Sequence, residues 1–198
     1  LARAQDIKKV SSPEYAPREM PNPEIVEMIN RGLKNGSVAS VDEALVLATM
    51  VGTETSGGKW GYGGGKYKGA FQISKDELRG GWGKEASKRL GRDVQHMEMS
   101  EFLRDPEAQV AVGAAAVRTK MATADRDIRY WKAHSDPRAE RYGNDPIARL
   151  ALTSSYHLGR LSTNEGAIPT GDPALGLGFF DGAGTSSADY YKAHYVNM

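Results

Sequence analysis

The feature that most constrains this chain is an apolar run that begins at a strong helix start and ends in a carboxylate. Ser40 and Glu43 stand three residues apart in the pattern of a capping box, which predicts a helix start. The following segment, residues 44–51, is apolar on almost every side, so we expect its helix to be central in the fold. The helix should reach Glu54 before a pair of glycines ends it.

Signals elsewhere in the chain predict further short helices. The clearest starts are the run from Asn22 to Glu24, a second capping box from Ser74 to Glu77, and Asp-Pro pairs at 105 and 145. Glycines at 36, 80–81, 91 and 159 should end helices, and a last short helix is expected near 187–196. The predicted class is mainly α with a small β element.

A loop rich in glycine and aromatic residues follows the central helix. Residues 57–69 intersperse glycines with Trp60, Tyr62 and Tyr67, a composition that suits tight turns and predicts a small β-hairpin. The apolar faces of such rings also suit the C–H faces of sugars. The loop is therefore a candidate saccharide-binding wall.

Composition excludes several classes of protein. The net charge is only +1 and the charged residues are spread along the chain, which argues against a dedicated nucleic-acid binder. The absence of cysteine excludes disulfides, thiolate metal sites and a cysteine nucleophile. No apolar run approaches the roughly 20 residues that span a bilayer. The chain starts at Leu1 with no visible signal peptide, so we expect a processed form or a segment of a longer protein.

Glu54 is the candidate catalytic residue. Burial disfavours the charged form of a carboxyl group and raises its pKa, which keeps it protonated near neutral pH. A protonated carboxyl group is what general-acid cleavage of a glycoside requires. The alternative interpretation is a solvated glutamate in the last turn of a helix.

Two segments around Glu54 resemble lytic transglycosylases and goose-type lysozymes. Residues 48–56, Ala-Thr-Met-Val-Gly-Thr-Glu-Thr-Ser, are similar to the catalytic-helix motif of these families. Residues 69–73, Gly-Ala-Phe-Gln-Ile, resemble their Gly-Leu-Met-Gln-Ile segment, and Gln72 follows Glu54 at a similar separation. Residues 54–60 also resemble resuscitation-promoting factors of the same superfamily.

Later segments resemble the same families in the same order. Residues 105–113 are similar to the Asp-Pro-x-x-Asn-Ile-x-x-Gly helix start, and residues 151–159 to the Ala-x-x-x-x-Tyr-Asn-x-Gly motif. The resemblance spans residues 23–198 with an unmatched insertion at about 123–143, and leaves residues 1–22 as an extended N-terminal tail. It implies a lysozyme-like α+β domain, with the hairpin beside a catalytic groove.

The resemblance also implies roles for individual residues. Glu54 would be the catalytic acid, and Tyr156 would hold it by a hydrogen bond. The expected substrate-binding residues are Ser56, Trp60, Tyr62, Phe71, Gln72, Tyr156, His157 and Tyr195. One or two of the aromatic residues are also explained as core residues, and Gln72 as a polar residue that ends a strand. Thr55 and His157 stand where serine and asparagine are usual, and Ala70-Phe71 replaces Leu-Met.

A second catalytic carboxylate is missing from the neighbourhood of Glu54. Two-carboxylate glycosidases need one, yet residues 57–73 contain none, and the capping box already explains Glu77. A single acid suits a lytic transglycosylase, which forms 1,6-anhydromuramyl ends without cofactor or metal. The histidines at 96, 134 and 194 show no ligand spacing that would indicate a metal site.

Two alternatives remain open at this point: a glutamate-dependent muramidase or chitinase-type hydrolase, and a non-catalytic module that binds the cell wall. The expected partner in each case is a peptidoglycan glycan strand, with no nucleic acid and no membrane span. The expected location is extracytoplasmic, in the periplasm or cell wall. The protein would be secreted or delivered by a phage particle or secretion system, and could form part of a larger virion or secretion assembly.

Overall fold

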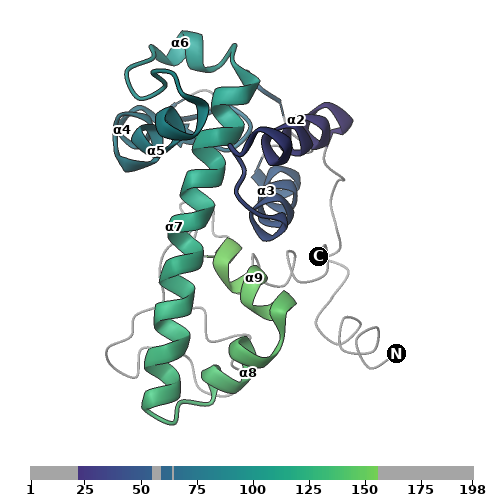
Figure 1. The fold of residues 1–198 in the computed structure, drawn as a ribbon, viewed down its shortest axis with the longest axis vertical. Helices are drawn as coiled ribbons and strands as arrows, with labels where there is room; N and C mark the ends of the chain where they lie inside the picture. The colour runs from purple at the N-terminus through teal and green to yellow at the C-terminus, as the bar shows by residue number, and fades with distance from the viewer. Residues whose placement is uncertain (1–21, 55–58, 64, 156–198) are drawn as a thin grey trace. The chain divides into compact units, whose positions relative to one another are not determined.

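The computed structural model describes residues 22–54, 59–63 and 65–155 (Figure 1). Of residues 52–54, 141, 154 and 155 it describes the backbone only. The described residues are mainly helical, with one two-stranded sheet, which confirms the predicted mainly α class. The chain divides into two compact units, with the division after Thr119. The predicted N-terminal tail and the helix near 187–196 lie outside the described residues, apart from Asn22.

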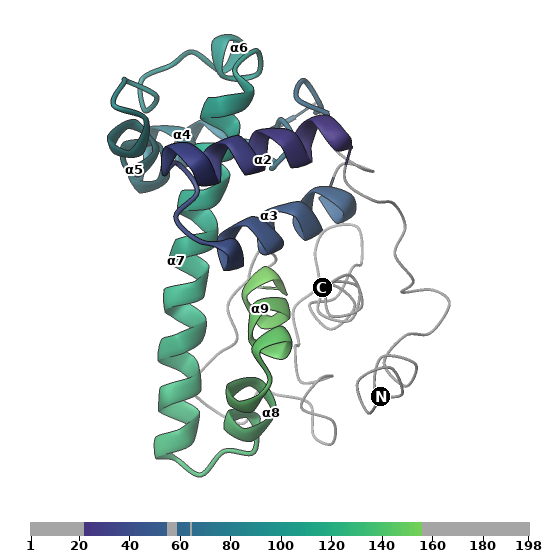
Figure 2. The same cartoon turned by 45° about the vertical axis from the view of Figure 1, so that its right-hand side comes forward.

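Helix α2 (Pro23–Asn35) begins and ends as predicted. The Asn22 side chain accepts a hydrogen bond from the backbone N–H of Glu24 at 3.0 Å, and Pro23 occupies the first helical position. Gly36 ends the helix with a φ of 83°, in the left-handed region that glycine enters without steric cost. Helix α3 (Val41–Glu54) lies beside α2 in both views (Figure 2).

The first turn of α3 contains Glu43, which forms a buried ion pair with Arg89. The backbone N–H of Glu43 donates to the Ser40 hydroxyl at 3.1 Å, which is half of the predicted capping box. The Glu43 carboxylate accepts instead from the N–H of Ala39, at 2.7 Å, and from the Arg89 guanidinium at 3.1 Å. The Glu43 and Arg89 side chains are 3% and 7% exposed. The carboxylate therefore joins α3 to a second helix.

The β-hairpin extends beyond the segment where the composition predicted it. Strand β1 (Tyr67–Lys68) pairs antiparallel with β2 (Ile73–Ser74), so the second strand lies past residue 69. Gly69 and Gln72, with φ values of 79° and 50°, turn the chain between the strands. The glycine-rich stretch thus precedes the hairpin for the most part, and backbone pairing rather than composition sets its position.

Three short helices follow the hairpin: α4 (Lys75–Arg79), α5 (Gly81–Leu90) and α6 (Met99–Phe102). Both hydrogen bonds of the predicted Ser74–Glu77 capping box are present, at 3.3 and 2.8 Å. Gly80 separates α4 from α5, and Gly91 ends α5, as predicted. Helix α6 was not predicted, because its N-cap is Glu98 rather than one of the usual capping residues.

Helix α7 (Pro106–Ala133) contains the longest continuous buried stretch among the described helices. Residues 108–117 of α7 are all buried, whereas Val41 and Leu45 of α3 are 64% and 39% exposed. The small residues of α7 allow close approach on several sides. A Cβ atom added to Gly113 would lie 2.9 Å from Leu47 of α3 and 3.0 Å from the Phe71 ring. This segment of α7 is therefore the centre of the first unit.

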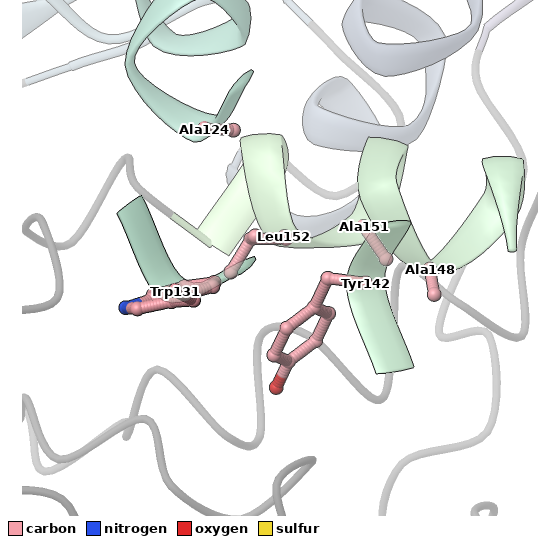
Figure 3. Packing of buried hydrophobic residues seen from close by; sticks show 6 residues of the cluster. All are labelled: Ala124, Trp131, Tyr142, Ala148, Ala151 and Leu152. Carbon is pink, nitrogen blue, oxygen red and sulfur yellow. The ribbon is translucent and has the colours of Figure 1, made fainter. Parts of the chain in front are cut away.

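The described part of the second unit contains the end of α7, α8 (Arg138–Asn144) and α9 (Pro146–Ser155). The charged stretch 123–143, expected as an insertion, is helical along most of its length. Figure 3 shows the buried cluster that holds these helices together. Its members are Ala124, Trp131, Tyr142, Ala148, Ala151 and Leu152. Asp145 caps α9 as predicted, by accepting from the N–H of Ile147 at 2.9 Å.

Candidate functional site

Glu54 is the last residue of α3, and the helix that leads to it is buried on one side. Val51 is fully buried and Met50 is 3% exposed. Leu47 lies seven residues before Glu54, so both positions fall on nearly the same side of the helix, about 10 Å apart. Ser56, Tyr156, His157 and Tyr195 lie outside the described residues. Their predicted contacts with Glu54 and with substrate remain predictions.

The end of α3 and the hairpin are related through Gly113 of α7. Leu47 and Phe71 both approach this glycine, as the close contacts of an added Cβ atom indicate. Phe71 is followed directly by Gln72, the polar residue of the hairpin turn. The side of α3 that carries positions 47 and 54 is therefore the side that meets the hairpin. Position 54 lies about 10 Å further along the same side of α3.

The aromatic residues of the loop divide into exposed and buried members. Tyr62 and Tyr67 are 45% and 48% exposed, and Trp60 is half-buried. Phe71 is 2% exposed and packs in the core, which is the alternative interpretation for one of these aromatic residues. Lys66 lies 5.7 Å from the centre of the Tyr67 ring. The described loop thus presents two tyrosine rings to solvent beside a cation.

Gln72 combines a strained backbone with a fixed side chain. Its φ of 50° lies in the left-handed region, which costs a non-glycine residue on the order of 1–3 kcal/mol. The side-chain Nε2 donates to the carbonyl oxygen of Gly69 at 2.9 Å, and the backbone N–H of Gln72 donates to the same oxygen at 3.2 Å. Among the described residues nothing donates to Oε1. This oxygen is free to accept a hydrogen bond from a ligand N–H.

Gln109 is a buried polar residue behind the loop that is not among the site residues predicted from the sequence. Its side chain is 1% exposed and makes four hydrogen bonds from α7. Oε1 accepts from the N–H of Ala70 at 2.9 Å, and Nε2 contacts the carbonyl oxygen of Trp60 at 3.0 Å. Nε2 also lies 3.2 Å from the carbonyl oxygens of Phe102 and Leu103. A polar residue within the apolar stretch 108–117 was the available signal.

The carboxylates after the hairpin face solvent or cap a helix. Asp76 has a side chain that is 88% exposed, with the Lys66 ammonium 3.9 Å away. The Glu77 carboxylate accepts from the N–H of Ser74 in the capping box. Neither arrangement is that of a buried acid or nucleophile. In the part of the chain that the structure describes, no group of three or more histidine or acidic side chains has a geometry suited to a metal ion.

Comparison with known proteins identifies no relative of this chain. No family model matches the chain, no curated protein is detectably similar in sequence, and no solved structure matches its fold. Among the described helices, none combines the length and apolar character needed to cross a membrane.

Proposed function

We propose that this protein is a peptidoglycan lytic transglycosylase of the lysozyme-like superfamily, with Glu54 as its only catalytic carboxylate. The observation that carries the proposal is the meeting of Leu47 and Phe71 at Gly113. Leu47 lies on the side of α3 that also bears position 54, and Phe71 directly precedes Gln72, so this contact supports a site between the two segments. The exposed rings of Tyr62 and Tyr67 give the adjoining loop surfaces on which sugar rings can stack.

The proposed reaction needs one carboxyl group acting twice. Protonated Glu54 donates its proton to the glycosidic oxygen between N-acetylmuramic acid and N-acetylglucosamine, and the C1–O bond breaks. The resulting carboxylate takes the proton of the muramyl C6 hydroxyl as that oxygen bonds to C1. The products are a new hydroxyl end and a 1,6-anhydromuramyl end, with Glu54 protonated again. The substrate N-acetyl group can stabilise the charge at C1, and the free Oε1 of Gln72 can accept its N–H.

The substitution Glu54→Gln tests this assignment. It keeps the size of the side chain and removes the proton, so lysis of purified peptidoglycan should fall by roughly 10²–10⁴ or more. Circular dichroism should remain that of the wild type. Asp76→Asn is the matched control, because it removes an exposed carboxylate after the hairpin and should leave turnover unchanged. Wild-type lysis by folded Glu54→Gln, or loss of lysis in Asp76→Asn, would contradict the single-acid mechanism.

The proposed substrate also sets the place of action. A glycan strand of peptidoglycan lies outside the cytoplasm, so the protein acts in the periplasm or cell wall. It reaches that place by secretion or as a component of a phage particle or secretion system.

A further inference from the structure

We infer that Gln109 is a positioning residue of the candidate site, which holds the aromatic loop and the hairpin turn on α7 and thereby places Gln72. The inference rests on the proposed function for its substrate. The anchoring itself is a property of the fold and is measured separately.

The hydrogen bonds of Gln109 reach both ends of the loop. Its Nε2 donates to Trp60, near the start, and its Oε1 accepts from Ala70, at the end. The two N–H bonds of Nε2 face three carbonyl oxygens, those of Trp60, Phe102 and Leu103, at 3.0–3.2 Å. One N–H must therefore be shared. Because the side chain is 1% exposed, water does not readily replace a lost bond, and each group would be left unpaired.

Gly69 connects the hydrogen bonds of Gln109 to the position of Gln72. Its carbonyl oxygen receives both the backbone N–H and the side-chain Nε2 of Gln72, so the position of Gly69 determines where the Gln72 amide lies. Gly69 precedes Ala70, whose N–H is held by Gln109. A Cβ atom at Gly69 would overlap Oε1 of Gln109, and its φ is 79°. The turn and the α7 side chain thus fit together only with glycine at this position.

The functional consequence concerns substrate affinity rather than proton transfer. Gln109 lies behind the loop in the core and does not supply the reacting proton. The free Oε1 of Gln72 is positioned through Gly69, so a displaced turn weakens the contact with a substrate N–H. Loss of Gln109 should therefore raise KM for soluble glycan strands while kcat changes little.

The test compares Gln109→Met with Gln95→Met. Methionine keeps the length of the side chain and removes its hydrogen bonds. Gln95 is the matched control, because its Nε2 also donates to a backbone carbonyl oxygen, that of Arg79 at 2.7 Å, away from the loop. For Gln109→Met we expect KM to rise about tenfold, equivalent to the loss of roughly 1.4 kcal/mol of binding, with kcat within about threefold. Gln95→Met should keep both values.

The indole N–H signal of Trp60 reports the anchoring without any substrate. It is assigned in a two-dimensional NMR spectrum by its absence from Trp60→Phe, and should shift in Gln109→Met but not in Gln95→Met. If Gln109→Met does not fold, Gly69→Ala disturbs the same contact from the loop side and should shift the signal and raise KM.

The positioning role of Gln109 and the proposed function would be contradicted by different results. Unchanged KM and an unchanged Trp60 signal in folded Gln109→Met, or equal effects in Gln95→Met, would overturn the positioning role. A shifted Trp60 signal with a fall in kcat alone would also overturn the affinity argument. If the wild type neither binds N-acetylglucosamine oligosaccharides nor lyses peptidoglycan, the proposed function fails, while the Trp60 signal still decides the anchoring.

Discussion

Gly113 has no side chain, and this allows α7 to approach α3 and the hairpin closely. Alanine normally stabilises a helix interior relative to glycine, by up to about 1 kcal/mol. Here the added methyl group would meet Leu47 at 2.9 Å and the ring of Phe71 at 3.0 Å. The tip of Leu47 can move, but the buried Phe71 ring has little room. We expect Gly113→Ala to lower the free energy of unfolding by about 1–3 kcal/mol, measured by urea denaturation.

Gly81 provides the control for this prediction. It is the first residue of α5, and nothing lies within 4 Å of an added Cβ atom. Gly81→Ala should leave the protein as stable as the wild type or up to about 1 kcal/mol more stable. Equal effects of the two substitutions would mean that helix propensity, not packing at Gly113, controls the outcome.

The sequence singled out Gln72 but not Gln109. The resemblance singled out Gln72 as a substrate-binding residue, and its strained φ of 50° is consistent with a special position. Gln109 was not selected, because one polar residue in an apolar helix has many explanations until its hydrogen bonds are known. Phe71 was expected to line a groove and is a core residue here, since its burial depends on α7, distant in sequence.

At the scale of elements, the connection between α7 and α8 contains a pH-sensitive ion pair. The Arg138 Nε donates to Asp136 at 2.9 Å, and the Arg138 guanidinium lies 4.5 Å from the centre of the Trp131 ring. The hydrogen bond from the Arg138 side chain lowers the pKa of Asp136 below its ordinary value, although partial burial opposes the shift. The ionised form of Asp136 is therefore the form that stabilises this connection.

Because the pKa of Asp136 is lowered in the folded state, the stability that this ion pair contributes decreases in acid. The stabilisation should be fully present above the unfolded pKa of about 3.9 and should be lost as the pH falls through the folded value. In a double-mutant cycle of Asp136→Asn and Arg138→Gln, we expect a coupling energy of up to about 1 kcal/mol at neutral pH. The coupling should shrink in acid. A coupling energy of the same size at pH 3 would contradict this assignment.

Local signals predicted the helix starts more reliably than the extent of the helices. The caps at Asn22, Ser74 and Asp145 form as expected because each depends on a side chain and an N–H two or three residues away. The length of α7 was not predicted. Its second half is charged, and only the packing of Trp131 and Ala124 against other helices shows which side is buried.

At the scale of the whole molecule, the number of catalytic carboxylates determines the product. In the proposed mechanism Glu54 is the only catalytic carboxylate, so no second carboxylate activates water or attacks C1. Digestion of purified peptidoglycan should therefore yield 1,6-anhydromuramyl ends. Mass spectrometry distinguishes them, because each fragment weighs one water less than its hydrolysed counterpart. Predominantly reducing ends would indicate a muramidase, and binding without fragments would indicate a non-catalytic module.

The mainly α class, most of the helix starts and stops, and the order of the motifs around Glu54 and Gln72 could be predicted from the amino-acid sequence. These features depend on contacts between residues close in the chain, whose types can be read directly. The tertiary structure was needed to show that residues 108–117 of α7 are buried at every position, that Phe71 is a core residue and that Gln109 hydrogen-bonds to Trp60 and Ala70. Each of these depends on residues brought together from distant segments, because burial and hydrogen-bond partners exist only once the helices have packed.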